Sequence, residues 1–236
     1  MPAEKSIPKP EASPPLVDRI TNSPPNTGQV YFQHRKPLVM TNITTPSGFL
    51  ECMDSASTLW RNKDKLGLKK SSIDVLKPVL PLLSPEEEEN LKKFVSICLT
   101  FNPDGQRLNG ECMICEHGVS AVESLSRLPD EPPKIRALVW VVDMANKADV
   151  DDTIVTAIAT LSKAADELDN SAWKALTWAY CASQQMNGFF GSWESQQALG
   201  YIQAVDDWLG DNEFPQLKIF NDRLRDSLQS ITGGRY

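Results

Sequence analysis

The chain has 236 residues, of which 41% are hydrophobic and 23% are charged, as is ordinary for a globular protein. That length allows a buried core in one large domain or in two small ones. A formal net charge of -7 and a pI near 5.0 argue against a protein whose whole surface binds nucleic acid, although a local basic patch is compatible with this balance.

The sequence carries no signal for a membrane. No apolar run reaches the roughly 18 residues needed to span a bilayer, and the first residues lack the apolar stretch of a signal peptide. Proline stands second, where N-myristoylation requires glycine. The five cysteines are odd in number and irregularly spaced, which favours reduced thiols over disulfides. We therefore expect a cytoplasmic protein, or one enclosed in a larger assembly.

The beginning of the chain differs from the rest in composition. Nine of the 17 prolines precede Ser47, and small polar or charged residues without an amphipathic period separate them. This predicts an extended arm over residues 1–46, rich in polyproline II structure. Within it lies an apolar patch, formed by Val30, Tyr31, Phe32, Leu38, Val39 and Met40. The patch needs a surface to bury it, on the chain's own body or on a neighbouring subunit, and the sequence leaves both open.

From Ser47 onward, hydrophobic residues recur at helical spacing, which predicts an all-α body of roughly eight or nine helices. In chain order, helices are expected over 48–67, 72–80, 84–101, a segment through Leu125, 134–147, 149–168, 170–187, 192–209, and a segment from Pro215 through Leu228. Pro78 and Pro81 are expected to kink or end the helix over 72–80, and Gly118 weakens the helix through Leu125. The apolar run 137–142 alone fits a buried helix or a buried strand, and the length of its segment favours the helix. No internal repeat is visible.

Local signals mark several boundaries of these helices. Ser84, Pro85 and Glu87 form a capping box with proline at the first helical position. Asp149 is the expected N-cap of the helix that follows it. The proline-rich break 129–133 predicts a boundary between two lobes, 47–128 and 134–231, followed by a flexible tail over 232–236.

Three cysteines and one histidine are of the residue types that bind zinc. Cys112 and Cys115 have the C-x-x-C spacing, His117 follows, and Cys98 lies upstream. A structural zinc site needs four such ligands. On a regular helix, however, His117 points roughly 140–160° away from the cysteine pair. The alternative, in which the cysteines are small buried side chains, is favoured. We therefore expect neither a metal nor another cofactor.

Motifs for catalysis are missing from the sequence. The chain has two histidines, and it contains no G-x-S-x-G, no glycine-rich phosphate loop and no H-E-x-x-H. A nucleophile needs a base beside it, and no such pairing is visible. The sequence therefore predicts a protein that is not an enzyme.

One dense basic cluster offers a binding function. It comprises Arg61, Lys63, Lys65, Lys69 and Lys70, and Arg35 and Lys36 in the arm can add to it. Such a cluster neutralises phosphates of RNA or of lipid head groups, or it places positive charge at a helix C-terminus. A glycine-flanked loop with Phe189, Phe190 and Trp193 either fills the core or forms a docking surface.

Together, a helical body, an arm with an apolar patch and a short tail resemble in layout the subunits of viral capsids, nucleocapsids and matrices. The resemblance implies a non-enzymatic, self-assembling structural protein, in the cytoplasm or inside a viral particle, whose arm docks on a neighbouring copy. One alternative is a module that binds single-stranded RNA through residues 61–70. Another is a cytosolic adaptor, in which other proteins bind the proline-rich arm.

Overall fold

Helices form all the regular structure in the part of the chain that we describe. The computed structural model describes residues 44–59, 74–100, 107–148, 150–187 and 192–233. In these ranges there is no strand, and the α-helices are α2 (Pro46–Leu59), α3 (Pro85–Thr100), α4 (Arg107–Ser126), α5 (Pro132–Ala148), α6 (Asp151–Glu167), α7 (Ala172–Asn187), α8 (Ser192–Asp211) and α9 (Pro215–Thr232). The prediction of an all-α body is confirmed.

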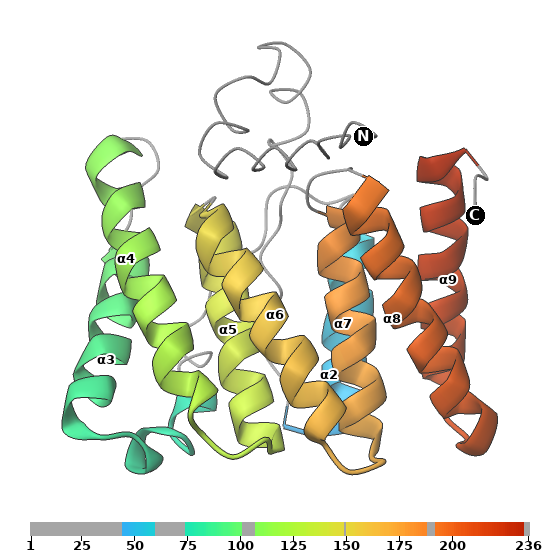
Figure 1. Ribbon diagram of the computed structural model, residues 1–236, viewed down its shortest axis with the longest axis horizontal. Coiled ribbons are helices and arrows are strands. Elements are labelled where there is room, and N and C mark those ends of the chain that lie inside the picture. Colours follow the sequence, from blue (N-terminus) through green and yellow to red (C-terminus); the bar gives the residue numbers. More distant parts are fainter. Residues whose placement is uncertain (1–43, 60–73, 101–106, 149, 188–191, 234–236) are drawn as a thin grey trace, which may run out of the picture. The chain divides into compact units, whose positions relative to one another are not determined.

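Helices that follow one another pack as antiparallel neighbours from α3 through α9 (Figure 1). In addition, α4 lies against α6 and α7 against α9. The exception to this sequential order is α2, which packs against α7 and α9, far from it in the chain. One hydrophobic cluster extends from Phe49 to Phe220 and crosses the proline-rich break between α4 and α5. The division into two lobes stays a prediction.

The apolar run 137–142 lies in the central helix α5. Every residue from Ala137 through Asn146 is buried there, since α3, α4 and α6 all pack against this helix. The Trp140 ring meets Phe94 of α3 edge to face, with ring centroids 6.2 Å apart. The helical interpretation of this segment is therefore confirmed, and burial from several sides explains why the run shows no polar face.

The predicted capping box at the start of α3 is present. The Ser84 N–H donates to Glu87 Oε2 at 2.9 Å, and the Glu87 N–H donates to Ser84 Oγ at 3.3 Å. One turn later, Lys92 pairs with Glu88 at 2.6 Å. The box satisfies amide groups that have no partner within the helix, which fixes where α3 begins.

The capping box makes stability depend on pH in the acidic range. Hydrogen bonds from Ser84, followed by the contribution of Arg127, lower the pKa of the Glu87 carboxyl below its ordinary value of 4.5. A carboxyl whose pKa is lowered on folding stabilises the protein above its unfolded-state pKa, and this contribution disappears as the pH falls through its folded-state pKa. We expect urea unfolding to show wild type losing its advantage over Glu87→Gln below about pH 4. An advantage that stays constant between neutral and acidic pH would contradict this.

Two local predictions are wrong. The helix expected over 72–80 is replaced in its described part by a 3-10 turn at 74–76 and the 3-10 segment Leu80–Leu82, because Pro78 and Pro81 cannot donate α-helical hydrogen bonds. The N-cap of α6 is Val150, which makes no side-chain capping bond. Asp149 itself lies outside the described residues. The acids of the first turn of α6, Asp151 and Asp152, instead suit the positive end of the helix dipole.

Two lysines close helical hairpins in the same way. Lys134, in the first turn of α5, donates to the carbonyl oxygens of Ser126 and Leu128 at 2.8 and 2.9 Å. Lys174, in the first turn of α7, donates to those of Asp166 and Leu168 at 2.9 and 3.1 Å. In both hairpins the acceptors lie eight and six residues before the lysine, so the ammonium group satisfies carbonyl groups at the end of the preceding helix.

Candidate docking groove

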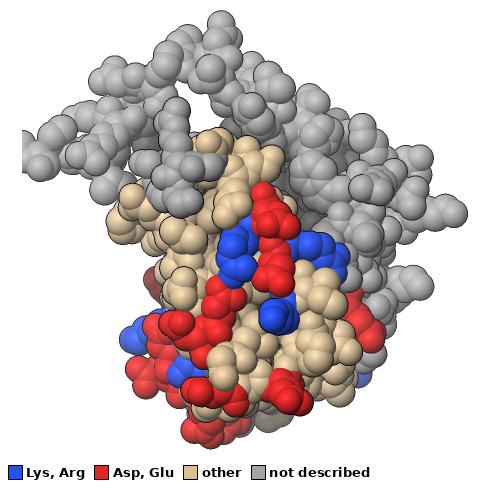
Figure 2. Space-filling model, turned by 90° about the vertical axis from the view of Figure 1, so that its right-hand side faces the viewer, with Lys and Arg blue, Asp and Glu red and all other residues tan. Residues whose placement is uncertain are grey.

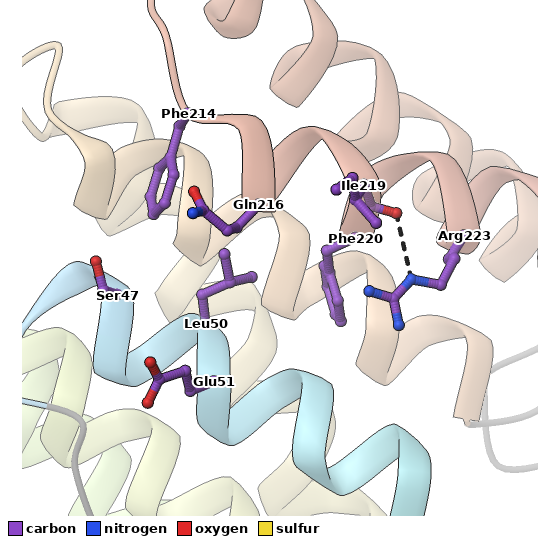
Figure 3. A pocket seen from close by; sticks show the side chains of 8 residues that line it. All are labelled: Ser47, Leu50, Glu51, Phe214, Gln216, Ile219, Phe220 and Arg223. Atoms are coloured by element: carbon purple, nitrogen blue, oxygen red, sulfur yellow. Dashed lines mark hydrogen bonds between the residues drawn. The ribbon is translucent and has the colours of Figure 1, made fainter.

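The candidate site is a groove between α2 and α9, with a volume of about 370 Å³ (Figure 3). It combines side chains from two segments that are about 165 residues apart in the chain. Its lining consists of Ser47, Leu50, Glu51, Phe214, Gln216, Ile219, Phe220 and Arg223.

The α2 wall is fixed by capping and aromatic packing. Thr45 precedes the helix, and its Oγ1 accepts a hydrogen bond from the Gly48 N–H at 3.1 Å. Phe49, on the buried face, stacks on Trp173 with ring centroids 5.7 Å apart and lies 5.9 Å from the ring of Tyr180. Because Phe49 faces α7, the next two residues, Leu50 and Glu51, border the groove.

The α9 wall is fixed by a polar network to α8. Asn221 donates from Nδ2 to the Ile202 carbonyl at 3.0 Å and to Asp206 Oδ1 at 2.9 Å. Arg225 bridges Asp206 and Asp222, with an N–O distance of 2.8 Å to the latter. These contacts hold α9 in one rotational setting, which fixes the direction in which Ile219 and Arg223 project.

The groove has an apolar floor and a mixed rim. Leu50 and Phe220 are 4% and 5% exposed and form the floor, whereas Ile219 on the rim is 56% exposed. Glu51 and Arg223 bring opposite charges from the two walls, and the Arg223 Nε donates to the Ile219 carbonyl at 3.4 Å (Figure 3). An open surface of this composition can hold an extended apolar segment.

A single signal in the sequence marks part of this groove. The apolar stripe of α9 contains Leu217, Phe220, Leu224 and Leu228, and all of them are buried or half-buried. Ile219 does not belong to this stripe, because it is rotated by roughly 100° about the helix axis from its neighbour Phe220. A large aliphatic residue on the polar face of an amphipathic helix indicates a second contact surface. Glu51 and Arg223 show no such departure from their surroundings in the sequence.

Most of the site residues predicted from sequence lie outside the described residues. This holds for the arm patch, for Arg35 and Lys36, for the cluster 61–70, and for Phe189 and Phe190. Trp193 is described, and its side chain is 65% exposed in the first turn of α8. Whether the loop fills the core or forms a docking surface stays a prediction. The other assignments stay predictions.

The cysteine and histidine candidates divide between two helices. Cys98 is buried in α3 at 3% exposure. Cys112, Cys115 and His117 all belong to α4, which runs without interruption through Gly118, so no irregular backbone turns His117 toward the pair. Among the residues with described side chains, no group of three potential ligands occurs. The side chains of Cys112 and Cys115 are not among them, so the zinc hypothesis stays untested.

The described cysteine deepest in the core is unsuited to nucleophilic chemistry. Cys181 is 0% exposed, and burial raises the pKa of its thiol well above the ordinary value. A cysteine nucleophile requires a thiolate that substrate can reach. Cys181 is therefore a packing residue of α7.

Comparison with known proteins gives no relative from which a role can be carried over. None of the described helices is long and apolar enough to cross a membrane. No family model, no curated protein and no solved structure matches the chain.

Proposed function

We propose that this chain is a non-enzymatic structural subunit that associates with copies of itself, and that the arm over residues 1–46 docks on the neighbouring copy. The observation that supports this proposal is the open apolar groove between α2 and α9. Ile219 on its rim is 56% exposed. Covering this apolar surface with an apolar segment lowers the free energy of the system, because both surfaces are removed from water.

The arm has the properties that such a docking segment needs. Its apolar patch cannot be stabilised in isolation, because eleven residues bury too little surface to form a core. Prolines on both sides of the patch restrict the backbone before binding, which reduces the entropy lost on docking. A capsid or nucleocapsid role would be one form of this self-association.

Association is expected to depend on the apolar patch. We define the arm variant as the full chain with Phe32→Asp, Leu38→Asp and Val39→Asp. Sedimentation over a range of concentrations should show wild type forming oligomers and the arm variant remaining monomeric, because three carboxylates cannot be buried in an apolar site. Wild type that stays monomeric, or an arm variant that associates equally well, contradicts the proposal.

The control for this experiment carries the same added charge elsewhere in the arm. Asn22→Asp, Asn26→Asp and Thr27→Asp introduce three carboxylates outside the patch. This control should associate as wild type does, since long-range repulsion among exposed charges is weak at physiological salt. Equal loss of association in both variants would point to net charge and not to the patch.

A second candidate function is binding of single-stranded RNA. Its support is that α2 ends at Leu59, just before the basic cluster in sequence, at the same end of the bundle where α8 begins with the exposed Trp193 (Figure 1). Exposed aromatic rings beside cations suit unpaired bases.

The RNA candidate is tested by salt and by charge removal. We expect affinity for a single strand to fall as salt rises, and to fall further when alanine replaces Lys63, Lys65, Lys69 and Lys70. The control replaces four lysines on other surfaces, Lys77, Lys92, Lys93 and Lys163. Equal losses for the two sets, or no binding at low salt, would contradict a role for residues 61–70.

A further inference from the structure

We infer that the groove between α2 and α9 is the receptor for residues 30–40 of a neighbouring copy, which makes the contact head-to-tail. This inference rests on the proposed self-association and goes further, because it names both surfaces. The arm and the groove are different parts of one chain, so each copy offers one donor and one acceptor.

The chemistry of the groove matches that of residues 30–40. The segment VYFQHRKPLVM has two apolar groups of residues around the cations Arg35 and Lys36, and it contains no acid. The groove has an apolar floor, and Glu51 lies exposed on one wall. Glu213, also exposed, immediately precedes the lining residue Phe214. A basic segment is therefore favoured over an acidic one.

The surroundings of the groove add to this preference. Figure 2 shows the side of the molecule nearest α9, where acidic side chains gather toward the end at which α8 passes into α9. Arg223 is the cation among the lining residues, and its Nε is already engaged with the Ile219 carbonyl.

The position of Thr44 shows where the arm is attached to the helical body. The Thr44 carbonyl accepts a hydrogen bond from Arg136 of α5 at 3.3 Å, so the polypeptide approaches α2 from the α5 side. The groove lies on the α9 side, and α2 stands between the two (Figures 1 and 3). Met40 is four residues before Thr44, a span of at most about 14 Å. That the segment comes from a neighbouring copy rests on the proposed self-association, and the mixing experiment below tests it.

A head-to-tail contact predicts that two differently disabled copies complement each other. The groove variant is the full chain with Glu51→Lys and Ile219→Lys, both at exposed positions, so that folding is preserved. It keeps its arm and loses its receptor, whereas the arm variant keeps its receptor and loses its donor. Each alone should be monomeric. Mixed in equal amounts, the two should form a one-to-one heterodimer that grows no further.

A matched control separates the groove from general surface effects. Val155→Lys with Glu167→Lys makes the same chemical changes at exposed positions of α6, away from the groove. This control should assemble as wild type does. The groove variant should weaken association at least about 30-fold, as the loss of a hot spot does. Circular dichroism verifies that all variants remain helical.

The possible results distinguish this inference from the function on which it rests. If the groove variant assembles like wild type while the arm variant is monomeric, the arm still drives association, and the groove is not its receptor. If the mixture of the two variants stays monomeric, the complementary head-to-tail contact is likewise overturned. If wild type itself is monomeric, the proposed self-association is wrong. Binding of a peptide of residues 28–42 to the groove of the arm variant would then indicate that the arm occupies the groove of its own chain.

Discussion

Replacing Lys134 by methionine is expected to lower the free energy of unfolding by about 2–4 kcal/mol, because the substitution leaves the buried Leu128 carbonyl and the partly buried Ser126 carbonyl without their donor. The side chain of Lys134 is 5% exposed, and its Nζ lies 2.7 Å from Asp130 Oδ1 in addition to its two bonds with carbonyl groups. Methionine preserves the length of the side chain but none of the three hydrogen bonds. Because Asp130 is one-third exposed, water can replace part of the hydrogen bonding that this carboxylate loses. The carbonyl groups that lose their donor therefore account for most of the expected destabilisation.

The equivalent lysine of the next hairpin provides the control for this measurement. Lys174 donates to two carbonyl groups but is less buried, and its Nζ lies 5.3 Å from the centroid of the Trp178 ring. Lys174→Met should therefore cost about 1 kcal/mol. Urea unfolding of both variants gives the comparison. If Lys134→Met cost no more than Lys174→Met, burial of the ammonium group would not be what distinguishes the two hairpins.

Gly118→Ala is expected to destabilise the protein by about 1–3 kcal/mol, although alanine is the better helix former. A Cβ at this position would lie 2.4 Å from Thr153 Oγ1, 2.7 Å from Thr153 Cγ2 and 3.1 Å from Phe94 Cε2. The glycine thus allows α4 to approach α6 closely, and an added methyl group forces the two helices apart.

The control for this substitution is a glycine with space around it. Gly200 lies in α8, and nothing is within 4 Å of the Cβ that an alanine would add. Gly200→Ala should therefore stabilise the protein by about 0.5–1 kcal/mol. Adding Thr153→Ala to Gly118→Ala removes both of the closest atoms and should recover part of the loss. Equal effects of the two glycine substitutions would show that the close approach does not determine stability.

Periodicity predicts this fold well where helices have a single buried face. The stripe of α9 and the capping box of α3 are local features, and both appear in the structure. Local patterns also explain the failures. Pro78 and Pro81 break the helix expected over 72–80 in its described residues. By helix propensity alone, Gly118 weakens α4, whereas the close approach of Thr153 comes from another helix and cannot be read from the local sequence.

The groove could not be predicted for a similar reason. It combines Ser47, Leu50 and Glu51 with residues of α9, and nothing in either segment indicates that α2 packs beside the last helix. The hydrogen bonds from Lys134 and Lys174 to the preceding helix could not be predicted either. In the sequence, both residues look like ordinary solvated charges in the first turn of a helix. Their function depends on the carbonyl groups of the preceding helix, which hydrophobic periodicity does not describe.

The central claim is that the arm of one copy occupies the groove of another, and cross-linking between distinguishable copies tests it most directly. Light-isotope and heavy-isotope preparations of the full chain would be mixed, both carrying a photoreactive amino acid in place of Gln33, inside the apolar segment. We expect cross-linked peptides that join a light chain to a heavy chain and map to residues 47–51 or 214–223. Cross-links that stay within one chain, or that map to other helices, would contradict the account.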